Sequence, residues 1–256
     1  IVSKIEELFS NIDSAKQSLE YAKLQLGQYR GSLLKSTFEE KSTKNNKSKI
    51  YDVENIDNVF KIIDYRGRTP PYSEQGIPHL RSNNVKNGKI NYNKIKFVTE
   101  STFAKYMTRG LPQKNDLLFT TEAPLGEIAE VPNKKFSLAQ RLIILRPIEH
   151  DSKFLMYQIM SPDFQLRLTG KKTGTVVTGL SSKNFKTMKI YTTSIKNEKI
   201  IATTLENQLI KIDPLFESLD KNMLFLHSLK ISILKKAFEG KLVPQDPNDE
   251  PAEILL

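Results

Sequence analysis

Apolar residues near both ends of the chain recur at alternating steps of four and three. The first stripe consists of Ile1, Ile5, Leu8, Ile12, Ala15, Leu19, Ala22, Leu26, Tyr29 and Leu33. The second consists of Leu205, Gln208, Ile212, Leu215, Leu219, Asn222, Leu226, Leu229 and Ile233. This spacing is typical of a coiled-coil seam. The pattern therefore predicts two long helices, with Gln208 and Asn222 as polar interruptions of the second seam.

The two helical segments are copies of each other, offset by 200 residues without a gap, as Asp13/Asp213, Leu26/Leu226 and Phe38/Phe238 illustrate. A repeat this regular indicates that both copies solve the same packing problem. If the domain between them is compact, its two ends lie close together, so we expect the helices to pair antiparallel. The expected pairing residues are Ile5, Ile12, Leu19, Leu26, Leu33, Leu205, Ile212, Leu219, Leu226 and Ile233. Pro214 predicts a kink or a late start in the second helix.

Residues 42–48 form a polar, helix-poor linker, and the sequence beyond them changes to short apolar runs between turn signals. Strands are expected over residues 59–65, 78–81, 95–99, 116–121, 127–131, 139–146 and 188–192, and helices over 101–107 and 153–168. The predicted fold class is α+β: one mixed α/β domain plus an antiparallel coiled coil. The expected divisions are a helix over 1–41, the mixed domain over 42–198, a helix over 199–242 and an acidic tail over 243–256.

Positive charge is concentrated in the middle of the chain. The whole chain carries +10; residues 1–41 carry zero, 199–241 carry +2 and 242–256 carry −4, which leaves +12 for residues 42–198. Two long stretches of this domain contain no acid, one between Glu74 and Glu100 and one between Asp163 and Glu198. A patterned excess of this kind favours a polyanion-binding face, and the alternative is a solvated basic surface.

Composition limits the other classes of protein. The absence of cysteine fits a reducing cytoplasm, and no run is long enough to be a membrane span. Because the chain does not begin with Met and Ile1 is already in helical register, we expect it to be a piece of something longer.

Catalytic chemistry has little support in the sequence. His79, His150 and His227 are too scattered for metal-ligand spacing. Residues 69–72, Thr-Pro-Pro-Tyr, resemble an amino-methyltransferase signature, but we expect a rigid proline turn there, because no glycine-rich cofactor turn follows a strand. No catalytic residue and no metal site is predicted.

Binding chemistry is better represented. Arginine forks suit guanine or phosphate, side-chain amides suit adenine edges, and a glycine-punctuated loop over residues 170–179 offers cations and hydroxyls to the DNA backbone. Because side-chain-capped turns are common, Asn83 and Gln140 have a structural role as an alternative. The predicted DNA-binding set is Arg66, Arg68, Arg81, Asn83, Asn84, Lys86, Lys89, Gln140, Arg141, Lys171, Lys172, Thr173, Thr175, Thr178, Ser182 and Lys183.

At these positions the sequence resembles the specificity subunit of type I restriction–modification enzymes. Residues 1–9 resemble the central conserved region of that family, and residues 234–252 resemble its distal conserved region closely. Residues 67–71, 76–78, 116–119, 138–141 and 179–181 resemble the scattered landmarks of a target recognition domain. The chain departs from the family pattern in holding one recognition domain instead of two and in the junction over residues 191–200.

The resemblance implies a noncatalytic reader of one half of a split double-stranded DNA target. It implies that the helices dock methyltransferase subunits, that a restriction subunit joins through the complex, and that S-adenosylmethionine, magnesium and ATP are held by those partners and none by this chain. A second hypothesis is a half-length subunit that acts chiefly as an assembly scaffold, in which a homodimer restores two reading heads and a symmetric target. An autonomous methyltransferase or nuclease is the third, and it depends on residues 69–72 alone.

Overall fold

The computed structural model describes residues 1–39, 51–65, 69–170 and 180–244. The chain forms two compact units, one made of Ile1–Arg30 with the residues from Gln208 onward, and one made of Gly31–Asn207. We call the first the helix pair and the second the recognition unit. The recognition unit is larger than the predicted middle domain, because it also takes in the end of the first long helix and the start of the last.

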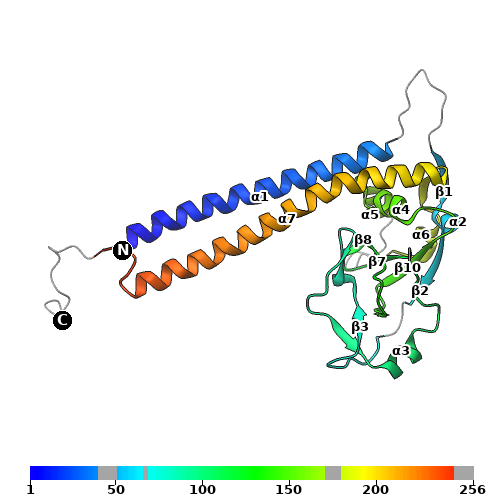
Figure 1. Cartoon of the computed structure of the whole chain (residues 1–256), viewed down its shortest axis with the longest axis horizontal. Coiled ribbons are helices and arrows are strands. Elements are labelled where there is room, and N and C mark those ends of the chain that lie inside the picture. The colour runs from blue at the N-terminus through cyan, green and yellow to red at the C-terminus, as the bar shows by residue number, and fades with distance from the viewer. Residues whose placement is uncertain (40–50, 66–68, 171–179, 245–256) are drawn as a thin grey trace, which may run out of the picture. The chain divides into compact units, whose positions relative to one another are not determined.

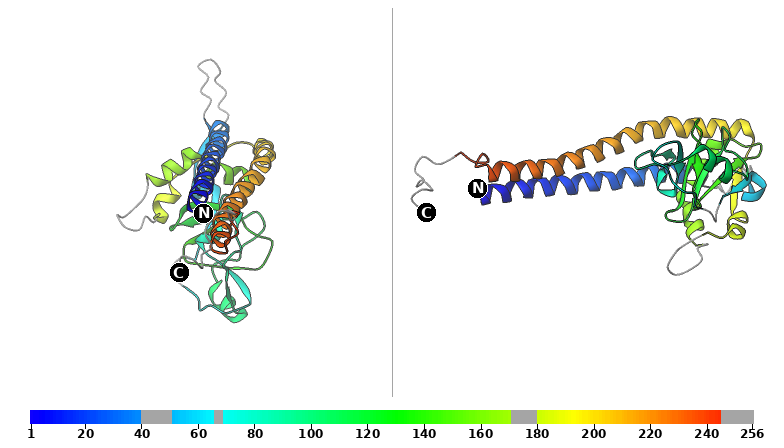
Figure 2. Two further views of the ribbon diagram at one scale, coloured as in Figure 1. Left: turned by 90° about the vertical axis from the view of Figure 1, so that its left-hand side faces the viewer. Right: turned by 90° about the horizontal axis from the view of Figure 1, so that it is seen from below.

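The helix pair consists of parts of α1 (Val2–Phe38) and α7 (Ile195–Phe238), which lie side by side (Figures 1 and 2). Ion pairs join Asp13 to Lys230, Lys23 to Asp220 and Arg30 to Asp213. Each step forward in α1 is matched by an equal step back in α7, so the helices are antiparallel, as the repeat predicts. Pro214 lies inside α7, which starts well before it.

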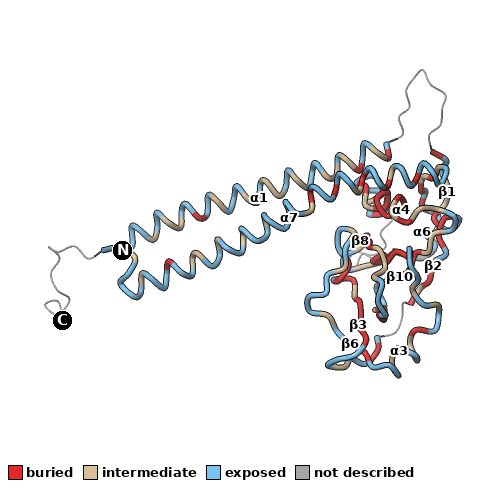
Figure 3. The backbone as a smooth tube through the Cα atoms, viewed as in Figure 1, coloured by how far each residue is buried: buried red, intermediate tan, exposed pale blue. Residues whose placement is uncertain are grey.

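Most of the helix pair is exposed or half-buried in Figure 3, and its few buried residues are apolar. Ile12, Ile212 and Ile233 are buried, and Ile5, Leu19, Leu26, Leu219 and Leu226 are half-buried. The remaining residues of the predicted pairing set, Leu33 and Leu205, lie in the recognition unit, where Leu33 is half-buried and Leu205 is buried.

Several seam positions predicted from the sequence are wrong. Gln208, Leu215 and Asn222 are exposed, and their neighbours Leu209, Phe216 and Met223 turn inward instead. Ile1 and Tyr29 are also exposed. The second seam is therefore apolar where the sequence pattern placed Gln208 and Asn222. The apolar side chains that follow them directly in the sequence, Leu209 and Met223, occupy the seam instead.

The recognition unit is built on a four-stranded antiparallel sheet with the order β2-β10-β7-β8. These strands are β2 (Phe60–Asp64), β7 (Leu117–Thr121), β8 (Leu125–Glu130) and β10 (Leu142–Pro147). All of β7 is buried, which explains its unbroken run of apolar and threonine side chains. A core cluster that includes Ile63, Leu118 and Ile144 joins this sheet to the rest of the unit.

Shorter elements surround this sheet. A three-stranded sheet has the order β6-β3-β9, from β3 (Ile77–Leu80), β6 (Lys96–Val98) and β9 (Ser137–Leu138). A hairpin joins β4 (Val85–Lys86) to β5 (Lys89–Ile90) through Asn87 and Gly88, both with positive φ. The unit also contains the short helices α2 (Ile56–Val59), α3 (Glu100–Tyr106) and α6 (Ser182–Lys186), and the 3₁₀ turn η1 (Ser82–Asn84).

The helix predicted over residues 153–168 is two helices, α4 (Ser152–Ile159) and α5 (Pro162–Thr169). The Ser161 hydroxyl accepts a bond from the Phe164 amide, and Pro162 occupies the first turn of α5. Proline is favoured at a helix start and cannot continue the preceding helix, so the break is local in origin. Asp151 caps α4 by accepting from the Phe154 amide at 2.9 Å.

The first and last strands of the recognition unit pair with each other. β1 (Asp52–Asn55) runs antiparallel to β11 (Lys189–Thr192). Beside them, the rings of Tyr51 and Tyr191 stack at 5.7 Å, and Phe38 at the end of α1 packs edge-on against Phe154 at 5.5 Å. The two ends of the unit are thus held together, as the sequence argument requires for antiparallel helices.

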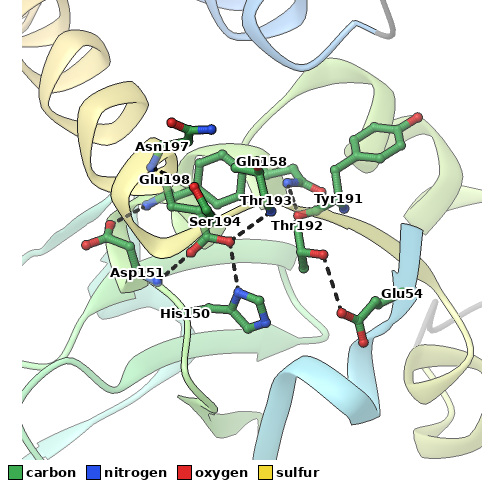
Figure 4. A network of polar contacts seen from close by, with 11 residues as sticks. Glu54, His150, Asp151, Gln158, Tyr191, Thr192, Thr193, Ser194, Asn197 and Glu198 are labelled. Carbon is green, nitrogen blue, oxygen red and sulfur yellow. Dashed lines mark hydrogen bonds and ion pairs between the residues drawn. The ribbon is translucent and has the colours of Figure 1, made fainter. Parts of the chain in front are cut away.

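The start of α7 is tied to the rest of the recognition unit by the buried carboxylate of Glu198 (Figure 4). One oxygen lies 2.8 Å from His150 Nδ1 and accepts from the Thr193 amide at 3.2 Å, and the other accepts from the Asp151 amide at 2.8 Å. A buried carboxylate is tolerated when its oxygens are hydrogen-bonded in this way. His150 is therefore a structural residue of this junction.

We expect Ile212→Ala to destabilise the helix pair by roughly 2–4 kcal/mol, because it removes a buried side chain and leaves a cavity. Leu215→Ala is the matched control, since Leu215 is half exposed and its truncation should change the free energy of unfolding by less than about 0.5 kcal/mol. Urea unfolding followed by circular dichroism measures both. If both variants lowered the free energy of unfolding equally, Ile212 would not be a residue of the buried seam.

Candidate nucleic-acid interface

A polar pocket of about 280 Å³ lies in the recognition unit and gathers residues from three separate parts of the sequence. The lining residues are Thr69, Tyr72, His79, Arg81, Ser82, Asn83, Ala139, Gln140 and Arg141. Four of them, Arg81, Asn83, Gln140 and Arg141, belong to the predicted DNA-binding set. We refer to this site as the Tyr72 pocket.

Parallel pairing of β3 with β9 creates the pocket. His79 lies opposite Ser137 and Leu80 opposite Leu138, and the Ala139 amide donates to the Leu80 carbonyl at 2.9 Å. Neighbouring parallel strands end at the same edge of a sheet. The residues that follow the two strands therefore meet, although almost sixty positions separate them in the sequence.

The four predicted residues present different polar groups. Asn83 and Gln140 are exposed, so their amides are accessible as both donors and acceptors. Arg81 is half-buried and donates from Nη2 to the Lys94 carbonyl at 2.9 Å, while its Nε has no hydrogen-bond partner among the described residues. Arg141 Nε lies 3.5 Å from Glu122. The arrangement offers one restrained and one exposed guanidinium beside two amides.

His79 is fully buried at the base of this site. Its Nδ1 lies 2.8 Å from the Ser137 hydroxyl, and its Nε2 has no partner within the described ranges. Burial, together with the nearby charge of Arg81, lowers the pKa of His79 to about 4. The imidazole is therefore neutral at neutral pH and contributes no charge to the pocket.

Asn84 is in the predicted DNA-binding set, but its side chain is occupied by contacts within the chain. Its side chain is buried, accepts from the Arg81 amide at 3.0 Å and donates to the Asn91 carbonyl at 2.8 Å. Both ends of the amide are thus used to hold the turn η1 and the loop after β5. Asn84 therefore stabilises the turn that carries Arg81 and Asn83.

The other predicted residues lie outside the pocket lining. Lys86 and Lys89 are exposed on the β4–β5 hairpin, which is fastened to β8 because the Asn87 amide donates to Glu127 at 2.8 Å. Lys183 is exposed on α6, and Ser182 is the first residue of that helix. Arg66, Arg68, Lys171, Lys172, Thr173, Thr175 and Thr178 lie outside the described residues.

Tyr72 and His79 are absent from the predicted DNA-binding set. Tyr72 belongs to the Thr-Pro-Pro-Tyr segment, for which the sequence predicts a rigid proline turn and no binding role. The signal that could have identified it is an aromatic residue at the border of an acid-free basic stretch, a combination typical of nucleic-acid binding.

The described part of the chain contains neither a metal-ligand cluster nor a membrane-spanning helix. Residues 1–39, 51–65, 69–170 and 180–244 contain no cluster of three or more His, Asp or Glu side chains placed to hold a metal ion. The same ranges contain no helix long and apolar enough to cross a membrane.

The lowered pKa of His79 predicts a pH-dependent stability. Between about pH 6.5 and pH 4 the unfolded chain binds a proton at this residue and the folded chain does not, so acidification favours unfolding by up to roughly 3 kcal/mol. His79→Phe should flatten this part of the stability profile, whatever its effect at neutral pH. Denaturant unfolding across this pH range measures the slope, and His227→Phe is the control, because His227 is exposed. Identical slopes in wild type and His79→Phe would contradict the assignment.

Comparison with known proteins agrees with the resemblance read from the sequence. The family model for the type I restriction modification DNA specificity domain matches residues 48–214. The chain is 24% identical to the EcoKI specificity subunit of Escherichia coli strain K12, over 98% of this chain and 57% of the relative. It is 26% identical to the MjaVIII specificity subunit of Methanocaldococcus jannaschii, over 94% of this chain and 58% of the relative. The chain thus spans a little over half the length of these relatives.

Solved structures share the fold. A chain from a study of complex assembly and conformational transition of the type I R-M system superposes with a TM-score of 0.66 at 17% identity, covering 94% of this chain and 59% of that one. The HsdS subunit from Thermoanaerobacter tengcongensis superposes with a TM-score of 0.50 at 18% identity, covering 94% of this chain and 57% of that one. The predicted α+β class with long helices is confirmed. The match to the family over most of the recognition unit, together with these relatives, places the chain in the type I restriction–modification DNA specificity family.

Proposed function

We propose that the chain reads one half of a bipartite double-stranded DNA target and takes no part in catalysis itself. The observation that carries this proposal is the Tyr72 pocket, where parallel strand pairing brings Arg81, Asn83, Gln140 and Arg141 together. Arginine forks and side-chain amides are the groups that discriminate bases in direct readout. The exposed lysines of the β4–β5 hairpin, which follows η1 directly, supply charge for the sugar-phosphate backbone.

The exposed end of α7 supports a two-part target. Leu34 and Phe38 at the end of α1 are buried in the recognition unit, whereas their repeat equivalents Leu234 and Phe238 are exposed, Phe238 by 90%. Equivalent apolar positions in a repeat are expected to meet equivalent partners. A second recognition domain packed against Leu234 and Phe238 would bury them and would supply the other half-site.

The helix pair is the proposed docking surface for methyltransferase subunits. Leu24 and Leu224 occupy equivalent positions in the two copies of the repeat, and both are exposed, by 58% and 72%. Contiguous exposed apolar surface marks interaction sites, and Tyr21, three residues before Leu24 on the same helix face, is also exposed, by 62%. The repeat equivalence of Leu24 and Leu224 favours two copies of the same partner. Methylation and cleavage then belong to methyltransferase and restriction subunits, which would hold S-adenosylmethionine, magnesium and ATP.

DNA recognition predicts two separable classes of variant. Selection from a randomised duplex pool should yield a preferred sequence for the wild-type chain, with binding that weakens steeply as salt rises. Asn83→Ala and Gln140→Ala should each reduce the discrimination between bases at one position of the target, by about 1–3 kcal/mol of binding free energy. Lys86→Ala with Lys89→Ala should instead weaken binding to all sequences. Lys16→Ala, on an exposed position of the helix pair, is the control and should bind as wild type. The proposal fails if the two classes behave alike or if duplex binding is insensitive to salt.

Docking is tested by Leu224→Asp, which places a charge on the proposed contact surface. We expect it to reduce the amount of cognate methyltransferase subunit that co-purifies with the chain at least tenfold, while Asn222→Asp, on an exposed polar position of the same helix, leaves it unchanged. The homodimeric scaffold makes a different prediction: the chain alone should sediment as a dimer. A monomer at high concentration that still captures the methyltransferase excludes the scaffold, and undiminished capture by Leu224→Asp excludes this docking surface.

A further inference from the structure

One wall of the Tyr72 pocket is an aromatic ring held in place. Tyr72 is 46% exposed, its ring centroid lies 5.4 Å from that of His79, and Lys96 Nζ lies 5.9 Å from the Tyr72 ring centroid. The next residue, Ser73, pairs with β6 through a bond from its amide to the Phe97 carbonyl at 2.9 Å. The ring is therefore presented to the pocket on an anchored backbone.

The segment behind Tyr72 cannot shift freely. Gly76 has a φ of +130°, and a Cβ there would lie 2.6 Å from the Val98 carbonyl oxygen. Only glycine fits so close to β6 in this conformation. Together with Ser73, this contact fixes the Thr-Pro-Pro-Tyr segment against the three-stranded sheet. The backbone of Tyr72 is thereby preorganised, so less conformational entropy is lost when a ligand binds.

The groups that line the pocket are mixed. Arg81 and Arg141 are hydrogen-bond donors, whereas Asn83 and Gln140 each carry a donor and an acceptor. A phosphate presents acceptors alone, so it would leave the two amide oxygens of the pocket without partners. A nucleobase presents donors, acceptors and a flat π-face, which matches two guanidinium groups, two amides and a tyrosine ring.

The concave shape of the pocket further limits which ligands it can bind. A base that remains stacked in the duplex lies at the floor of the major groove, which is itself concave, so such a base cannot enter a concave pocket on the protein. Whatever fills the Tyr72 pocket must protrude from the duplex or be free of it. A base turned out of the stack protrudes, and proteins that hold such bases do so by stacking against aromatic rings and hydrogen bonds to the base edge.

We propose that the Tyr72 pocket holds a single unstacked nucleobase, with the Tyr72 ring against its face and the amides of Asn83 and Gln140 at its edge. The proposal rests on the DNA-reading function proposed above and adds a mode of recognition to it. The base comes from a nucleotide extruded from the bound duplex, and a free mononucleotide presents the same chemistry.

The experiment uses the preferred duplex selected by the wild-type chain. At each position in turn, the base opposite is replaced by an abasic site, which removes the pairing energy that extrusion must overcome. At one position we expect binding to tighten at least fivefold. Tyr72→Ala should abolish this gain and Tyr72→Phe should keep it, because phenylalanine retains the ring. Circular dichroism checks that both variants fold, and Gln140→Ala should reduce the gain without touching the ring.

A second arm titrates the wild-type chain with the four deoxynucleoside monophosphates. Binding of one of them, lost in Tyr72→Ala and kept in Tyr72→Phe, would assign the pocket to free nucleotides. The inference is overturned if no abasic position tightens binding and no monophosphate binds, or if Tyr72→Ala retains the full gain. Failure of the wild-type chain to bind any duplex would instead refute the proposed function, and the monophosphate arm then decides the pocket alone.

Discussion

The pairing of β1 with β11 is the constraint on which the rest of this structure depends. These are the first and last strands of the recognition unit. Because they pair antiparallel, the segment that leads into the unit and the segment that leads out of it lie close together. A helix that ends at Phe38 and one that begins at Ile195 can then run antiparallel without a long connection. The stacked rings of Tyr51 and Tyr191 and the buried carboxylate of Glu198 reinforce the same junction.

The internal repeat gives the helix pair an approximate twofold symmetry. Asp13 is equivalent to Asp213 and Arg30 to Lys230, so the ion pairs Asp13–Lys230 and Arg30–Asp213 are the same pair made twice. Surface ion pairs contribute little stability individually, but two symmetric ones select one register against its neighbours. The symmetry does not extend to Phe38 and Phe238: Phe38 packs against Phe154 within the recognition unit and is buried, whereas Phe238 is exposed.

The candidate binding site follows from a different device, a short parallel pairing in a unit that is otherwise largely antiparallel. Because β3 and β9 run in the same direction, the segments after them converge, and each contributes one arginine and at least one amide. The neutral, buried His79 lies between these segments and the Tyr72 ring. Restrained polar groups around an aromatic wall favour recognition of a base, while exposed lysines on the neighbouring hairpin favour the backbone.

The sequence by itself determined the two long helices, their antiparallel sense, the α+β class and all four strands of the central sheet, because these depend on local periodicity and on a repeat with no gap. It could not decide which of two adjacent stripes of α7 forms the second seam. The contact between the two helices determines that Leu209 and Met223, and not Gln208 and Asn222, face the seam. Nor could the sequence separate the buried Asn84 from the exposed Asn83, because the hydrogen bonds that occupy Asn84 come from a turn and a loop formed on folding. The meeting of Tyr72, Asn83 and Gln140 was decided by tertiary structure alone, because strand pairing over long sequence separations leaves no periodic mark in the residues that it brings together.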